Sequence, residues 1–157
     1  MSGQPVYLSP EGKAQLEAEL DDLVNNKRHR LAERLHFAIK QGDLSENADY
    51  IQAKEEQAFL EGRILEVQQL LRNAIVIEMG GTEGGRVRLG SEVTVSEVGY
   101  DETETYYLVG PAEADPAKGR ISHESPLGKA LLGRKVGDKI SVHAPGGEIE
   151  FKIEEIA

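Results

Sequence analysis

The four residues Gly42-Asp43-Leu44-Ser45 decide the fold, because they interrupt two long segments of helical periodicity. Before the break, from about Pro10 to Gln41, apolar residues recur mainly in steps of three and four: Leu16, Leu20, Leu23, Leu31, Leu35 and Ala38. After it, a second stripe runs to about Asn73, made of Tyr50, Ala53, Leu60, Ile64, Val67 and Leu71. So short a break must fold two helices back on each other, and the sequence predicts an antiparallel coiled-coil hairpin.

The first stripe contains one slip. Lys27 stands where the next apolar residue belongs, and the stripe resumes only at Leu31. A slip of this kind is a stutter, which locally unwinds a coiled coil. Each helix has roughly 30 residues, so the hairpin is expected to be about 45 Å long at 1.5 Å per residue.

After Ala74 the apolar pattern changes from helical to alternating. Residues 74–78 are β-prone, and strands are predicted over residues 92–98, 103–109, 139–143 and 148–156. One short helix is predicted over residues 126–132, with Ser125 as its N-cap. The glycine-rich residues 80–85 are interpreted as a hinge. The fold class is therefore α+β, with a finger domain over residues 1–78 and a small, mostly antiparallel β domain over residues 79–157.

Composition excludes several classes of protein. The 157 residues include no cysteine, which rules out disulfide scaffolds, thiolate zinc sites and cysteine nucleophiles. No apolar run approaches the ~20 residues of a membrane span, and no secretion signal opens the chain, so a cytoplasmic protein without a membrane partner is expected. The net charge is −10, and residues 1–78 and 79–157 each carry 9 basic and 14 acidic side chains. Neither half is a basic module that coats nucleic acid.

Two acidic residues at the break, Asp43 and Glu46, have two interpretations. They are either the N-cap and third-position acid of the second helix, a variant of the capping box, or an exposed carboxylate pair suited to Mg²⁺. Two carboxylates fall far short of an octahedral shell. If they bind magnesium, another molecule must supply the remaining ligands.

A dense basic cluster lies in the first helix, at Lys27, Arg28, Arg30 and Arg34. One interpretation is a solvated helix face whose cations pair with nearby acids such as Glu33. The other is a surface that attracts RNA phosphates, an attraction that salt weakens.

Several longer motifs resemble one family. The segment GDLSENADY (residues 42–50) and its continuation AKEEQAFLEGRI (53–64) are similar to the signature of the bacterial GreA/GreB transcript cleavage factors. The segments YLSPEGKAQLEAEL (7–20) and SPLGKALLG (125–133) are similar too, and the matches run from near Tyr7 to Phe151. The resemblance implies a coiled-coil finger followed by an FKBP-like domain.

The resemblance also implies a function. In that family the finger enters the secondary channel of RNA polymerase, where its tip carboxylates help to hold a catalytic Mg²⁺, and the matching residues here are Asp43 and Glu46. The polymerase then hydrolyses its own backtracked transcript, so the factor itself is not an enzyme. By the same resemblance, a monomeric protein is expected to dock on the channel rim.

The resemblance assigns two further contact regions. The basic residues expected to face the channel or the RNA 3′ end are Lys27, Arg28, Arg30, Arg34 and Lys40. The docking face is expected at Ser125 and Pro126, with Leu127 as an exposed anchor.

Departures from the family pattern keep alternatives open. Ile39 replaces an arginine that the family commonly carries, and the neighbouring Lys40 leaves the transcript contact undecided. Gly128 occupies a position often taken by alanine. A channel-binding regulator that does not stimulate cleavage is therefore the main alternative. A prolyl isomerase is disfavoured because its pocket requires aromatics, of which the second half has only four: Tyr100, Tyr106, Tyr107 and Phe151.

Overall fold

The computed structural model describes residues 3–42 and 46–157. Its contacts divide the chain into two compact units, each described here by itself. The helical unit contains residues 13–73 and the start of the chain up to Gln4, and the sheet unit contains residues 5–12 and 74–157. The sequence analysis placed a boundary between residues 78 and 79, whereas packing assigns residues 5–12 and 74–78 to the sheet unit.

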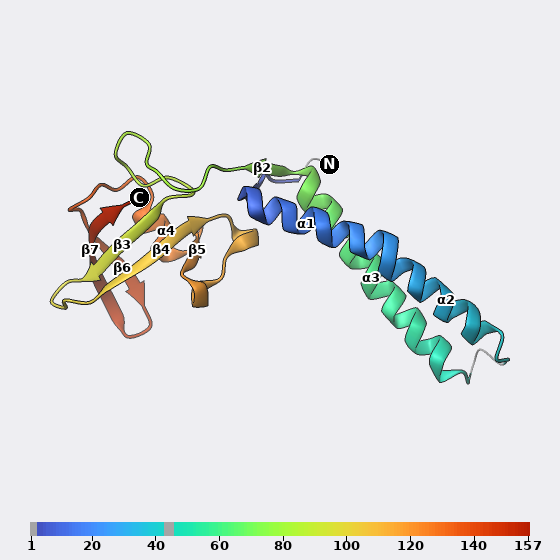
Figure 1. Ribbon diagram of the computed structural model, residues 1–157. Helices are drawn as coiled ribbons and strands as arrows, with labels where there is room; N and C mark the ends of the chain where they lie inside the picture. Colours follow the sequence, from blue (N-terminus) through green and yellow to red (C-terminus); the bar gives the residue numbers. More distant parts are fainter. Residues whose placement is uncertain (1–2, 43–45) are drawn as a thin grey trace. The chain divides into compact units, whose positions relative to one another are not determined.

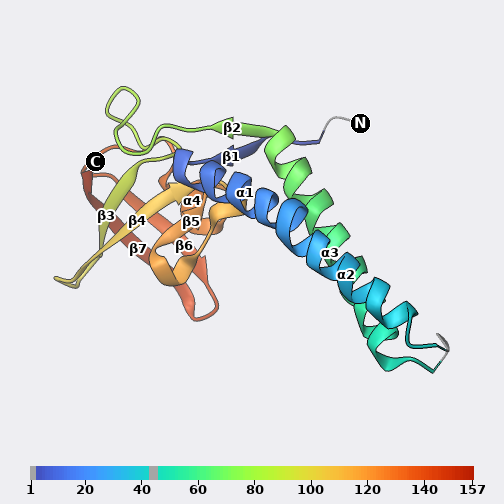
Figure 2. The ribbon, with the colours of Figure 1, turned by 45° about the vertical axis from the view of Figure 1, so that its right-hand side comes forward.

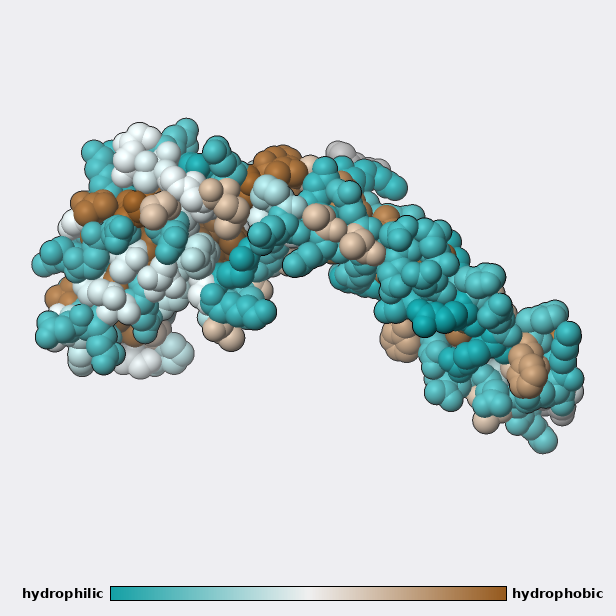
Figure 3. All heavy atoms as spheres, in the orientation of Figure 1, coloured by the Kyte–Doolittle hydropathy of each residue, from teal (hydrophilic) through white to brown (hydrophobic). Residues whose placement is uncertain are grey.

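The helical unit is the predicted hairpin. Its first arm consists of α1 (Pro10–Asp22), the π-helical turn η1 (Leu23–Lys27) and α2 (Arg28–Ile39), and its second arm is α3 (Ala48–Arg72). The two arms run side by side in both ribbon views (Figures 1 and 2). A narrow apolar seam joins them, with Leu23, Ile64 and Val67 buried at its centre. The outer surface of these helices is mostly hydrophilic in Figure 3.

The π-helical turn coincides with the slip in the first apolar stripe. The backbone N–H of Arg28 bonds to the carbonyl of Leu23, five residues earlier, so this turn holds one more residue than an α-helical turn. A regular heptad continuing from Leu23 would place seam residues at 27, 30, 34 and 37. The extra residue instead brings Leu31, Leu35 and Ala38 to the seam, and Leu31 and Ala38 are buried there.

The sheet unit holds a five-stranded sheet in the order β5-β4-β3-β7-β6. The bounds are β3 (Glu92–Glu97), β4 (Thr103–Val109), β5 (Arg120–Ser122), β6 (Lys139–Ala144) and β7 (Gly147–Ile156). All neighbouring strands are antiparallel except β4 and β5, which confirms the mostly antiparallel prediction. Two further strands, β1 (Val6–Leu8) and β2 (Ala74–Val76), pair in parallel. The sequence analysis missed β1 and β5, which are too short to show alternation.

One face of the sheet packs into a continuous apolar core. Its buried members are Val87, Val93, Val95, Leu108, Ile121, Leu131, Ile140 and Ile153. The predicted short helix is α4 (Pro126–Leu131), which contributes Leu131 to this core, and two 3₁₀ turns, η2 (Pro111–Glu113) and η3 (Pro116–Lys118), link β4 to β5. In the described part of the chain, no helix is both long and apolar enough to cross a bilayer.

Candidate functional site

The break between the two arms is organised by Asn47. Its Oδ1 accepts a hydrogen bond from the backbone N–H of Tyr50 (3.1 Å), so Asn47 is the N-cap of α3. Its Nδ2 donates to the carbonyl of Ala38 near the end of α2 (2.8 Å), which ties the two arms together at the tip. Sequence reasoning missed this role, although an asparagine directly before a helical stripe is a usable signal.

The capping interpretation of Glu46 is therefore wrong. Glu46 precedes the N-cap and lies outside α3, with its side chain exposed. Its predicted partner, Asp43, lies outside the described residues, so the geometry of the pair rests on the sequence alone. Exposed carboxylates have the hard oxygen donors that Mg²⁺ prefers. Since no group of three or more potential ligands occurs within residues 3–42 and 46–157, a magnesium site here would need donors from another molecule.

Two residues of the basic cluster, Arg28 and Arg34, pair with acids across the hairpin. Arg34 contacts Glu56 at 2.5 Å, and Arg28 contacts Glu61 at 2.8 Å. The predicted pairing of Arg30 and Arg34 with Glu33 is wrong, because Arg34 pairs with Glu56 and Glu33 lies 3.4 Å from His29. The reason is geometric: the facing arm presents carboxylates closer to the arginines than their own helix does.

The π-helical turn has its own polar network. Asn26 donates a 2.8 Å hydrogen bond to Asp22, and Lys27 lies 3.7 Å from the same carboxylate. The hydrogen bond, followed by the positive charges of Lys27 and Arg30, lowers the pKa of Asp22 below its ordinary value. Arg30 makes no ion pair with the described residues, so its charge is the least compensated of the cluster on α2.

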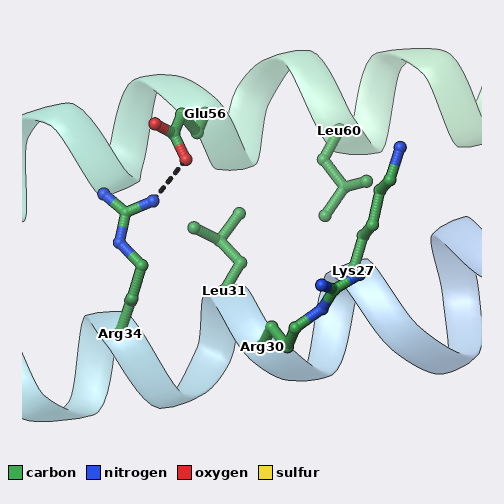
Figure 4. Close-up of a pocket in the computed structure, with 6 residues that line it drawn as sticks. All are labelled: Lys27, Arg30, Leu31, Arg34, Glu56 and Leu60. Carbon is green, nitrogen blue, oxygen red and sulfur yellow. Dashed lines mark hydrogen bonds and ion pairs between the residues drawn. The ribbon is translucent and has the colours of Figure 1, made fainter.

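A shallow groove of about 380 Å³ lies between the arms beside this turn. Figure 4 shows the side chains that line it. Leu31 and Leu60 supply its apolar surface. Its other lining residues are Lys27, Arg30, Arg34 and Glu56. With three cations against one carboxylate, the groove favours an anionic group. Lys40, the remaining predicted contact, is exposed just beyond the end of α2.

The predicted docking residues surround the start of α4. Ser125 caps this helix as predicted, since its Oγ accepts from the N–H of Gly128 (3.1 Å) and donates to the carbonyl of Ser122 (2.6 Å). Pro126 is exposed. The expectation that Leu127 is an exposed anchor is wrong, because Leu127 is half-buried and packs against the sheet core.

Two exposed apolar residues near α4 were not predicted. Leu132 is 44% exposed and Val136 is 57% exposed, and they flank the turn at Gly133. Leu132 also lines a groove of about 430 Å³ together with Arg86 and Arg88. Neither residue continues an apolar stripe of a predicted strand or helix. That absence of periodicity is only a weak sequence signal that a side chain is exposed.

Family models match nearly the whole chain. A model described as "Transcription elongation factor, N-terminal" matches residues 6–76, and one described as "Transcription elongation factor, GreA/GreB, C-term" matches residues 82–157. Together they cover both the helical and the sheet units.

Relatives and solved structures were compared as well. Transcription elongation factor GreA of Bacillus anthracis is 47% identical over 154 residues, 98% of each chain. GreA of Acetivibrio thermocellus is 46% identical over 155 residues, 99% of this chain and 98% of the relative. Among solved structures, the GreA factor homolog 1 (Gfh1) protein of Thermus thermophilus is 31% identical, with 98% and 99% of the two chains covered and a TM-score of 0.45. The identity to the GreA proteins and the two model matches establish that this chain belongs to the GreA/GreB family of transcription elongation factors.

Proposed function

We propose that this protein binds RNA polymerase in the bacterial cytoplasm and stimulates the polymerase to hydrolyse backtracked transcripts. The finger would enter the secondary channel and present Asp43 and Glu46 to the polymerase active site. The observation that carries the proposal is the position of Glu46. Its carboxylate is exposed and lies outside α3, while Asn47 performs the capping, so Glu46 remains available to an external ligand.

In this proposal the factor is not itself an enzyme. Asp43 and Glu46 would hold a Mg²⁺ ion together with polymerase carboxylates, and the ion would supply charge stabilisation for the displacement at the transcript phosphate. The contribution of this chain would be to deliver two carboxylates at the end of the helical hairpin. The groove at Arg30 and Lys27 supports a contact with an anionic RNA segment or channel wall, and the exposure of Pro126 is compatible with docking through the sheet unit.

A prolyl isomerase receives no support from the groove described above in the sheet unit. This groove of about 430 Å³ is lined by Glu83, Arg86, Val87, Arg88, Leu89, Leu132 and Gly133. None of these seven residues is aromatic, whereas a proline-binding pocket depends on aromatic faces. A shared fold alone is no argument for a shared activity.

The test is a cleavage assay on a backtracked polymerase complex. The variants Asp43→Asn and Glu46→Gln remove one negative charge each and leave the Asn47 cap intact. We expect cleavage to fall by roughly 100-fold or more, because removing one ligand or electrostatic group from such a site costs factors of this size. Raising magnesium is expected to rescue the variants in part, by mass action. Binding to polymerase is expected to stay within about twofold, since docking is assigned to the sheet unit.

A matched control is Glu55→Gln, which removes the same charge from an exposed position on α3. It is expected to leave cleavage unchanged. Full cleavage by Asp43→Asn at low magnesium would exclude the metal role. A wild-type protein that binds polymerase without releasing short 3′ RNA would instead favour the regulator without cleavage activity.

A further inference from the structure

Glu113 holds a carboxylate that the proposed function does not use. It ends the short turn η2, and its side chain is only 13% exposed. Its Oε2 accepts a hydrogen bond from the backbone N–H of Ser9 (2.6 Å), and its Oε1 accepts one from the Ser9 hydroxyl (2.6 Å). The guanidinium of Arg120 also donates to Oε1, at 3.3 Å. A largely buried carboxylate is thus satisfied by one residue that lies 104 positions away and by one basic partner.

Ser9 in turn caps the first arm of the hairpin. Its Oγ accepts from the N–H of Gly12 (3.0 Å), three residues on, as an N-cap side chain does. Ser9 is almost fully buried, at 3% exposure. The hydrogen bonds therefore run from the first turn of α1, through the Ser9 hydroxyl, to Glu113. The negative charge of Glu113 at this helix start is also favourable to the helix dipole.

Gly12 leaves the space that Glu113 occupies. A Cβ added at Gly12 would lie 2.2 Å from Oε1 of Glu113, far inside contact distance. An alanine there would push the carboxylate away from Ser9, because the end of a glutamate side chain moves more easily than the helix backbone. Ser9, Gly12 and Glu113 therefore depend on one another although they are far apart in the sequence.

These contacts lie inside the sheet unit, which includes residues 5–12. The helix that they cap continues without a break to Asp22, well into the helical unit. The start of the finger is thus held by the same unit to which docking is assigned. The chain passes from one unit to the other at residues 4–5, 12–13 and 73–74.

We propose that Glu113 is a positioning residue for transcript cleavage: it fixes the start of α1 in the sheet unit, so that docking of the sheet unit delivers the tip reproducibly. This inference rests on the proposed function. It predicts that loss of the anchor leaves docking intact and lowers the rate at which docked factor promotes cleavage, because small misplacements of a catalytic group are costly.

The first experiment separates binding to polymerase from correct placement of the finger tip. For Glu113→Ala we expect the maximal cleavage rate at saturating factor to fall about tenfold, and the half-saturating concentration to stay within about twofold. Glu97→Ala, an exposed glutamate in the same unit, is the control and is expected to change neither value. A loss that appears only in the half-saturating concentration would overturn the proposal, because it would place Glu113 in docking.

The second experiment needs no cleavage at all. Since the chain has no cysteine, two introduced at exposed positions, Glu55→Cys and Glu102→Cys, accept spin labels specifically. In the free protein we expect Glu113→Ala to broaden the distribution of distances between the labels. A variant that keeps its circular dichroism spectrum and an unchanged distribution would overturn the inference. If the wild type fails to stimulate cleavage, the proposed function falls, while this measurement still tests the anchor.

Gly12→Ala provides an independent way to displace the carboxylate. It is expected to reproduce both effects of Glu113→Ala. The double variant is expected to be no worse than either single one, because both remove the same interaction. Additive losses would show that Gly12 and Glu113 act separately and would contradict the proposal.

Discussion

The helical unit and the sheet unit bury their apolar residues in different ways. In the helical unit the seam is one layer thick, and its central cluster has three buried residues, Leu23, Ile64 and Val67. In the sheet unit eight buried residues form one cluster beneath the strands and α4. A residue in the sheet core is enclosed on all sides, whereas a seam residue has solvent close by on both flanks.

The charges of the two arms complete the contrast. The ion pairs that cross the hairpin, Arg28 with Glu61 and Arg34 with Glu56, have side chains that are almost half exposed. Such pairs contribute little, typically 0–1 kcal/mol each. The hairpin is thus an extended and modestly stabilised element that presents residues. The sheet unit has the larger core. A stable core suits the docking role that is proposed for this unit.

The largest expected effect comes from the same substitution made in each unit. Ile153→Ala in the sheet core is expected to lower the free energy of unfolding by about 4 kcal/mol, and Ile64→Ala in the seam by about 2 kcal/mol, because the thin seam can relax around the missing atoms. Urea unfolding can follow the units separately. Helical circular dichroism reports mainly on the hairpin, and four of the five tyrosines lie in the sheet unit (Tyr7, Tyr100, Tyr106 and Tyr107). Equal losses of unfolding free energy in the two units would contradict the idea that the seam relaxes more easily than the sheet core.

The second comparison uses two glycines. A Cβ at Gly128 would lie 2.0 Å from the carbonyl oxygen of Ser122, a backbone atom, so Gly128→Ala is expected to destabilise the sheet unit by about 3 kcal/mol. Gly62 in α3 has open space, and Gly62→Ala is expected to stabilise the hairpin by about 1 kcal/mol. Thermal unfolding of both variants measures whether each substitution lowers or raises stability. A harmless Gly128→Ala would mean that α4 can move away from β5.

A third prediction concerns the π-helical turn. Deletion of Asn25 is expected to close this turn into regular α-helix and still leave Leu31, Leu35 and Ala38 on the seam, with a change below about 1 kcal/mol. Deletion of Ala32 shortens the spacing between Leu31 and the later seam residues, so that Leu31 and the later residues cannot all face the seam. It is expected to lower the stability of the hairpin by about 2 kcal/mol. Urea unfolding followed by helical circular dichroism measures both. Equal losses would mean that the turn does not serve to reset the seam.

The smallest effect is expected from the ion pairs. Arg34→Met is expected to change hairpin stability by less than about 0.5 kcal/mol, because the Arg34–Glu56 pair is exposed to solvent. A double-mutant cycle with Glu56→Gln, run at low and at high salt, isolates the pair. A coupling well above 1 kcal/mol would show that the pairs, rather than the seam, hold the arms together.

The sequence by itself determined most of the secondary structure. The hairpin, four of the five strands of the main sheet and α4 follow from apolar periodicity and from Ser125, because these signals act between residues close in the chain. The slip at Lys27 also showed that the first stripe shifts, and the structure adds that one π-helical turn absorbs the shift. The three-residue strands β1 and β5 left no comparable signal.

Tertiary structure decided the partners of the side chains. Arg34 pairs with Glu56 rather than with the nearby Glu33, and Leu127 packs against the sheet core although the neighbouring Pro126 is exposed. Glu113 meets Ser9 across 104 positions of sequence. Spacing along a chain predicts contacts within one helix only. Contacts between distant segments depend on how whole elements pack, and a single sequence does not contain that geometry in any local pattern.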